Sequence, residues 1–89
     1  MKTIESLINA SKKVYVRMSS DAICRRFFAQ AEREGFLFGG ENPTDKHPSD
    51  LIAVLPDKRL CYVGTIGRIA AESGAENVVV VEAEELLAP

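Results

Sequence analysis

Three residue types that together can perform nucleophilic catalysis occur in this chain, namely Cys61, His47 and Asp50. A thiol attacks its substrate when an imidazole takes its proton and a carboxylate orients that imidazole. Cys61, however, lies in a strand pattern between Leu60 and Tyr62, where a cysteine is ordinarily a buried thiol. We therefore expect no catalytic residues, and we predict that the protein is not an enzyme.

The spacing of metal-binding residue types predicts no metal site. His47 is the only histidine, and Cys24 and Cys61 are far apart, without Cys-x-x-Cys or His-x-x-x-His spacing. Two cysteines in a short chain without a secretory signal predict free thiols rather than a disulfide. We accordingly expect neither a metal nor another cofactor.

A segment with two glycines, Gly64-Thr65-Ile66-Gly67-Arg68, follows a predicted strand and opens a predicted helix. Such glycines let a phosphate approach backbone N–H groups at a helix N-terminus, and an arginine can bind it with two parallel hydrogen bonds. The segment completes neither the dinucleotide-binding fingerprint nor the P-loop. The alternative is a plain strand-to-helix turn. The candidate phosphate ligands are Gly64, Thr65, Gly67 and Arg68.

Basic side chains supply a second candidate site, for a partner protein. Three arginines lie on the predicted helix 21–34, and a lysine and the histidine lie in the polar loop 41–50, which two prolines stiffen. Long loops in small domains are often functional, although this one could simply connect two strands. The candidate partner contacts are Arg25, Arg26, Arg33, Lys46 and His47.

The charge distribution argues against nucleic acid as the partner. Residues 1–59 carry ten Lys/Arg against eight Asp/Glu, a balance of +2, and residues 60–89 carry one against five, a balance of −4. A nucleic-acid-binding domain is expected to be markedly basic, and Tyr15 alone is too little for a base-stacking surface. No apolar run reaches the ~20 residues that span a membrane, and no secretory signal is present. We expect a cytoplasmic protein that does not contact membranes.

Hydrophobic periodicity predicts the elements that must position these residues. Composition and length predict one domain, residues 1–89, whose helices pack on one face of a four- or five-stranded, mostly antiparallel sheet in a two-layer α+β fold. The valine run 78–81 predicts a strand that is covered on both faces or lies at the seam of a homodimer. Helices are predicted at 1–13, 21–34 and 68–73, strands at 14–18, 36–38, 51–55, 59–63 and 78–81, and either a helical turn or a frayed tail at 83–89.

A series of short motifs extends over residues 14–67. They are Val14-Tyr15-Val16-Arg17, Ser19-Ser20-Asp21, Phe27-Phe28-x-x-Ala31-Glu32-x-x-Gly35-Phe36-x-Phe38-Gly39, Pro43-Thr44, Ser49-Asp50-Leu51-Ile52-Ala53-Val54 and Tyr62-Val63-Gly64. In this pattern the chain resembles small proteins of bacteriophages, prophages and related mobile elements.

The resemblance implies a role in countering host defence. Some small phage proteins of this kind are anti-defence factors, including anti-CRISPR proteins, which bind a host complex without chemistry, and others sequester nucleotide signals. The first expectation is therefore a non-enzymatic accessory protein that binds and inhibits a bacterial host defence protein such as a CRISPR effector. The alternatives are a sponge for a nucleotide or another phosphate-bearing ligand, and a structural domain that forms homodimers. The resemblance carries no site residues over to this chain.

Overall fold

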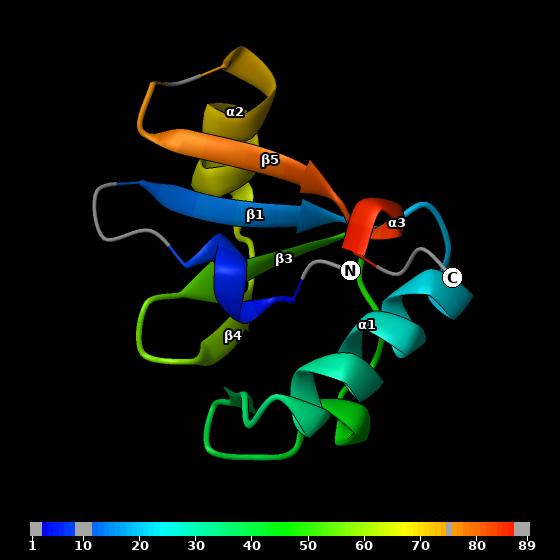
Figure 1. Ribbon diagram of the computed structural model, residues 1–89. Helices are drawn as coiled ribbons and strands as arrows, with labels where there is room; N and C mark the ends of the chain where they lie inside the picture. Colours follow the sequence, from blue (N-terminus) through cyan, green and yellow to red (C-terminus); the bar gives the residue numbers. More distant parts are fainter. Residues whose placement is uncertain (1–2, 9–11, 75, 87–89) are drawn as a thin grey trace.

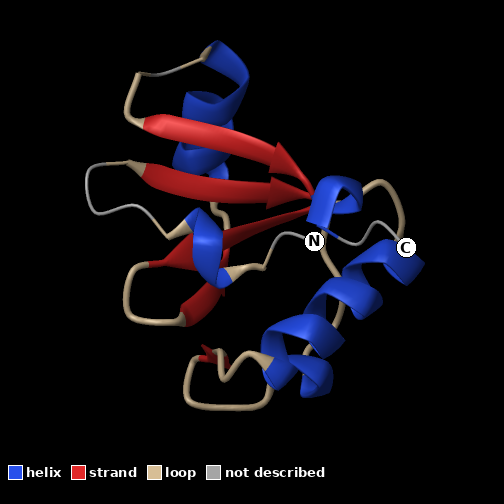
Figure 2. Cartoon of the chain, in the orientation of Figure 1, coloured by secondary structure: helices blue, strands red, loops and turns tan. Residues whose placement is uncertain are grey.

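A five-stranded sheet and three α-helices make up the described part of the computed structural model, which covers residues 3–8, 12–74 and 76–86 (Figures 1 and 2). In chain order the elements are η1 (Glu5–Leu7, 3₁₀), β1 (Lys13–Arg17), α1 (Asp21–Arg33), β2 (Leu37–Phe38), η2 (Pro43–Asp45, 3₁₀), β3 (Leu51–Leu55), β4 (Arg59–Tyr62), α2 (Thr65–Ser73), β5 (Val78–Glu82) and α3 (Ala83–Leu86). The α+β class predicted from the sequence is confirmed.

The strand order of the sheet is β2-β4-β3-β1-β5, and the sheet is mixed rather than mostly antiparallel. The β3–β4 hairpin and the β1–β3 pair are antiparallel, whereas β1–β5 and β2–β4 are parallel. The parallel pairs arise because α1 and α2 are crossovers, which return the chain to its earlier direction before β2 and before β5. The sequence predicted the hairpin but not these two crossovers.

The helix α1 covers one face of the sheet. The side chain of Ser20 accepts a hydrogen bond from the N–H of Ile23 and begins the helix, and Gly35 follows its end at a φ of 88°. The buried side of the helix is the predicted stripe, and it packs on alternate residues of the central strands. This core contains Cys24, Phe27, Phe28 and Ala31 of α1 with Val14, Val16, Ile52, Val54 and Leu60 of the sheet.

The helix α2 lies against the opposite face, whereas the sequence placed all helices on one face (Figure 1). The two crossovers run in opposite directions across the sheet, from β1 to β2 and from β4 to β5. Since crossovers are nearly always right-handed, opposite directions place their helices on opposite faces. A second, smaller core results, with Tyr15, Leu51, Ala53 and Val63 packed against Ala71 and Val78.

The described residues at the N-terminal end correct one expectation, and those at the C-terminal end decide between two predicted alternatives. Of the helix predicted over residues 1–13, the described residues form only the single 3₁₀ turn Glu5–Leu7, and Lys13 already belongs to β1. The apolar spacing there serves one turn that inserts Ile4 into the core. At the other end, Ala83–Leu86 is helix α3 with Ala83 and Leu86 buried, and not a frayed tail. Residues 1–2, 9–11 and 87–89 lie outside the described part.

Candidate functional site

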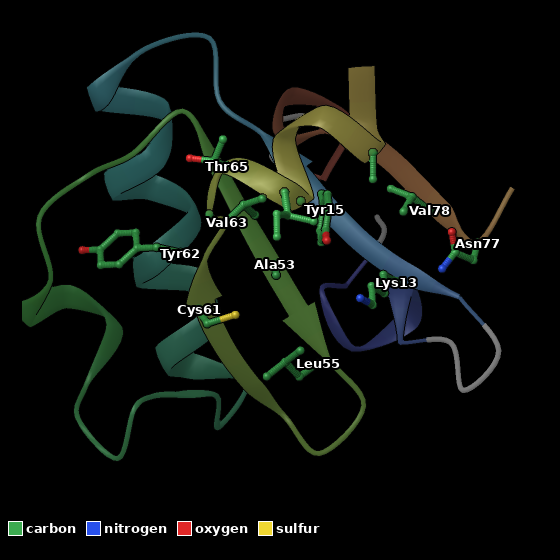
Figure 3. A pocket seen from close by; sticks show the side chains of 14 residues that line it. Lys13, Tyr15, Ala53, Leu55, Cys61, Tyr62, Val63, Thr65, Asn77 and Val78 are labelled. Carbon is green, nitrogen blue, oxygen red and sulfur yellow. The ribbon is translucent and has the colours of Figure 1, made fainter. Parts of the chain in front are cut away.

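A hollow of about 650 Å³ lies on the α2 side of the sheet (Figure 3). Its floor comes from β1, β3, β4 and the start of β5, and its wall is the first half of α2. Most of this surface is apolar. The floor includes Tyr15, Ala53, Leu55, Cys61, Val63 and Val78, the wall includes Gly64, Thr65, Ile66, Gly67 and Ala70, and Lys13 and Asn77 lie beside the floor.

The hollow exists because α2 covers only part of this face. Gly67 places the helix backbone directly over Tyr15 and Val63: a Cβ at this position would lie 2.7 Å from Val63 Cγ1 and 3.0 Å from the Tyr15 hydroxyl oxygen. The helix is only nine residues long, and no other described helix covers the sheet toward Lys13 and Leu55 on this side (Figure 3). One half of the face is therefore closed by tight packing, and the other half is open.

The hydroxyl of Tyr15 is the most unusual polar group of the hollow. The residue is only 7% exposed, yet its hydroxyl has no hydrogen-bond partner among the described residues and is not sealed from solvent. A tyrosine with a buried ring ordinarily directs its hydroxyl to a partner. In Figure 3 the hydroxyl is directed into the hollow. Tyr15 is therefore positioned to donate a hydrogen bond to a molecule that occupies this space.

Lys13 adds a positive charge beside this hydroxyl. It precedes Tyr15 by two residues on β1, so both side chains stand on the same face of the sheet, with roughly 7 Å between their Cα atoms. Its side chain is exposed and has no ion-pair partner within the described ranges. Figure 3 shows the Tyr15 side chain beside α2 and the Lys13 side chain further toward the start of β1, on the part of the face that α2 leaves uncovered. The pair offers one cation and one neutral donor to an anion.

Cys61 faces the hollow, but His47 does not. Partial burial raises the pKa of the Cys61 thiol, which therefore stays protonated at neutral pH. His47 is on the other side of the sheet, where its ring stacks on Tyr62 at 4.8 Å between centroids and the Tyr62 hydroxyl donates to the His47 carbonyl at 2.7 Å. Asp50 binds an arginine elsewhere, so the three residue types needed for nucleophilic catalysis do not meet.

The residues of the glycine-containing segment lie on two different sides of α2. Gly64, Thr65 and Gly67 line the hollow, as a ligand site would require. Arg68 lies on the other flank, where its two terminal nitrogens donate to the carboxylate of Asp50 at 3.0 and 2.7 Å. Hydrogen bonding from Arg68 holds the pKa of the Asp50 carboxyl below its usual range, although slight burial opposes this. Three of the four residues predicted to bind phosphate therefore line the same hollow, whereas the guanidinium of the fourth, Arg68, is bound to Asp50.

Of the five predicted partner contacts, two line a common hollow and three lie at separate places. Arg25 and Lys46 meet with Phe28 and Thr44 around a hollow of about 200 Å³, so α1 and the polar loop do form one surface there. Lys46 is also ion-paired with Glu41 and lies over the Phe38 ring at 5.7 Å. The other contacts lie elsewhere: Arg26 is exposed on α1, Arg33 is two turns beyond Arg25, and His47 stacks on Tyr62. Their role in binding a partner remains a prediction.

Sequence reasoning did not place Tyr15 or Lys13 in a candidate ligand site. The alternation of β1 correctly placed Tyr15 on the face away from the α1 core. Nothing local in the sequence indicates that α2 would bury its ring and leave its hydroxyl open, because that depends on the strand order. Within the described ranges, no three His, Cys, Asp or Glu side chains gather as a metal site would require, and no helix has the length and apolar character needed to cross a membrane.

Comparisons of the chain with protein-family models, with curated proteins and with solved structures each find no match. Function must therefore be argued from the geometry of the site.

Proposed function

We propose that this protein is a non-enzymatic binding protein that holds a small anion with an apolar body in the hollow beneath α2. The observation that carries the proposal is the environment of Tyr15. More than nine-tenths of this residue is buried, yet its hydroxyl has no hydrogen-bond partner among the described residues and is open to the hollow. In the mobile-element setting implied by the motifs of residues 14–67, such a protein would sequester a host signal molecule.

The size and lining of the hollow suit a small molecule. Ligand sites in proteins commonly enclose roughly 300–1,000 Å³ and combine apolar walls with a few polar groups that fix the orientation of the ligand. Here the walls are apolar strand and helix residues, and the polar groups are the Tyr15 hydroxyl, the Lys13 ammonium and the amide of Asn77. A planar ring fits the apolar floor, while its anionic group fits Lys13 and Tyr15.

A nucleotide is the biological class that combines these properties. Its base can lie on the apolar floor, and its phosphate can accept from Tyr15 and pair with Lys13. This location differs from the helix N-terminus with Arg68, which the sequence suggested, because Arg68 is already bound to Asp50. Gly64 and Thr65 remain beside the site as part of its wall.

The aromatic sulfonate 8-anilinonaphthalene-1-sulfonate tests the site directly, because its fluorescence rises in an apolar environment. We expect the wild-type protein to bind it. The Tyr15→Phe and Lys13→Ala variants should each weaken binding about tenfold, as expected for one lost hydrogen bond to a charged group or one lost ion pair near the surface. The matched control is Lys12→Ala, which removes a neighbouring exposed lysine that does not line the hollow.

Equal binding by the wild type, Tyr15→Phe and Lys13→Ala would contradict the proposed site. Near-ultraviolet circular dichroism must show intact tertiary packing, since this dye also binds loosely packed proteins. A panel of nucleoside monophosphates and cyclic nucleotides, tested as competitors for the dye, then examines the nucleotide class.

Inhibition of a bacterial defence protein is the second candidate function. Two large apolar side chains beside the hollow favour it, since Ile66 is 86% exposed and Ile69 is 61% exposed on α2. Exposed neighbouring isoleucines of this kind often mark a protein-binding surface. If this surface binds the partner, Ile66→Glu with Ile69→Glu should abolish capture of a stoichiometric host protein from a nuclease-treated lysate. Capture lost instead with Arg25→Ala and Lys46→Ala would assign the contact to α1 and the polar loop.

A further inference from the structure

The outer edge of β5 is an unpaired strand edge. β5 is the last strand of the sheet, and no described residue pairs with its outer side. Lys13 is in register with Val78, and its N–H donates to the carbonyl of Asn77 at 2.8 Å. In a parallel ladder the residues of a strand alternate between facing the neighbour and facing away. The backbone N–H and C=O of Val79 therefore face β1, and the backbone N–H and C=O of Val80 face outward.

The side chains of this strand also remain partly uncovered. All four valines from Val78 to Val81 are only half-buried, with alternate residues on the α1 side and the α2 side of the sheet. An added strand would cover valines on both faces at once while its backbone pairs with the outward groups. Alternating donors and acceptors at this spacing are complementary to one partner geometry, an extended chain.

Charge distinguishes between a second copy of the chain and a different partner. Three exposed carboxylates that have no ion pair among the described residues flank the two ends of β5 in the chain, and a fourth, Glu82, pairs with Arg17 at 3.2 Å. A second copy of β5 would bring the same set of negative charges to the seam, and like charges there repel. The three carboxylates are Glu76 before β5, and Glu84 and Glu85 of α3.

We propose that the outer edge of β5 binds a basic, extended segment of a partner protein as an added strand. The backbone of Val80 supplies the central hydrogen bonds, the valines supply apolar contact, and the carboxylates at the two ends of β5 select lysine and arginine in the added segment. This inference goes beyond the ligand site, because Val80 does not line the hollow. It also disfavours self-pairing as the role of the valine run.

A short peptide of alternating lysine and valine, labelled for fluorescence anisotropy, tests this surface. We expect it to bind the wild-type protein and to bind less tightly as salt is added. Val80→Pro removes the outward N–H and leaves the bonds to β1 intact, so binding should weaken about tenfold, the effect of one to two lost backbone hydrogen bonds. The matched control Val80→Thr keeps the N–H and the branched shape and should bind like the wild type.

Two further peptides separate strand pairing from simple charge attraction. The same peptide methylated at every backbone nitrogen, and a glutamate–valine peptide, should both fail to bind the wild-type protein. Equal binding of the methylated peptide would overturn the proposal, and so would tighter binding of the glutamate–valine peptide. These wild-type results decide the matter even if Val80→Pro does not fold.

Sedimentation of the protein alone supplies the remaining outcome. A stable dimer that Val80→Pro converts to a monomer would overturn the proposal in favour of self-pairing. Binding of 8-anilinonaphthalene-1-sulfonate should be the same in the wild type and Val80→Pro, so that failure at the strand edge and failure of the ligand site are distinguishable.

Discussion

Gly67→Ala is expected to lower the free energy of unfolding by about 1–2 kcal/mol, although the same exchange in a helix ordinarily stabilises by up to about 1 kcal/mol. The new methyl group would lie 2.7 Å from Val63 Cγ1 and 3.0 Å from the Tyr15 hydroxyl oxygen, so α2 or the side chains of Val63 and Tyr15 must shift. Urea denaturation measures the change. The dye should also bind less tightly, because Gly67, Val63 and Tyr15 all line the hollow.

Gly64→Ala is the matched control for this prediction. Gly64 precedes α2 at a φ of −79°, which any residue can adopt, and no atom lies within 4 Å of a Cβ built there. We expect its effect on the free energy of unfolding to stay within about 0.5 kcal/mol. If Gly67→Ala is as stable as Gly64→Ala, the contact between α2 and Tyr15 is looser than the structure indicates, and the explanation of the hollow fails with it.

The comparison of Gly64 with Gly67 shows why this segment was ambiguous in the sequence. Both glycines suggest a flexible turn that admits a phosphate, yet only Gly67 is required by packing, and besides the nearby Val63 it contacts a tyrosine far earlier in the chain. Arg68 likewise suggests an anion ligand, but its partner is Asp50. Spacing along the chain cannot reveal partners that the tertiary fold brings together.

Local signals predicted the parts of the fold that depend on neighbouring residues. The Ser20 cap, the buried stripe of α1 and Gly35 after it are all within one helix, and the hairpin β3–β4 depends on one short turn. The placement of α2 was not predictable in this way. It depends on the strand order, which sets the direction of each crossover and hence the face that its helix covers.

In the candidate site, too, local signals predicted some features, and others depend on the tertiary fold. Alternation in β1 identified which face Tyr15 occupies, but the burial of its ring and the exposure of its hydroxyl result from the length and position of α2. The role of the valine run was also undecided in the sequence. Interpreting the run requires the strand order, in which β5 is the last strand, because a run of apolar residues fits a central strand and an edge strand equally well.

Glu34→Gln is expected to destabilise the protein by about 1–3 kcal/mol at neutral pH, because hydrogen bonds to a charged group are worth more than neutral ones. The Glu34 carboxylate accepts from the N–H groups of Ile4 and Glu5 and from the Gln30 side chain, each at 2.9 Å. It thereby fastens the first turn of the chain to the end of α1. The amide of glutamine keeps the shape but loses the charge and one acceptor oxygen.

The dependence on pH identifies the carboxylate as the cause. Partial burial raises the pKa of Glu34, but hydrogen bonds from Gln30, Ile4 and Glu5 and the charge of Lys58 outweigh it, so the net pKa is lowered. Its stabilising effect is therefore complete above the ordinary glutamate pKa of about 4.3 and is lost as the pH falls through the lower folded-state value. Urea denaturation should show the difference between wild type and Glu34→Gln shrinking over this range. The control Glu76→Gln, at an exposed glutamate without a hydrogen bond or ion pair among the described residues, should change stability little at any pH. A constant difference for Glu34→Gln would show that shape rather than charge holds the N-terminal turn.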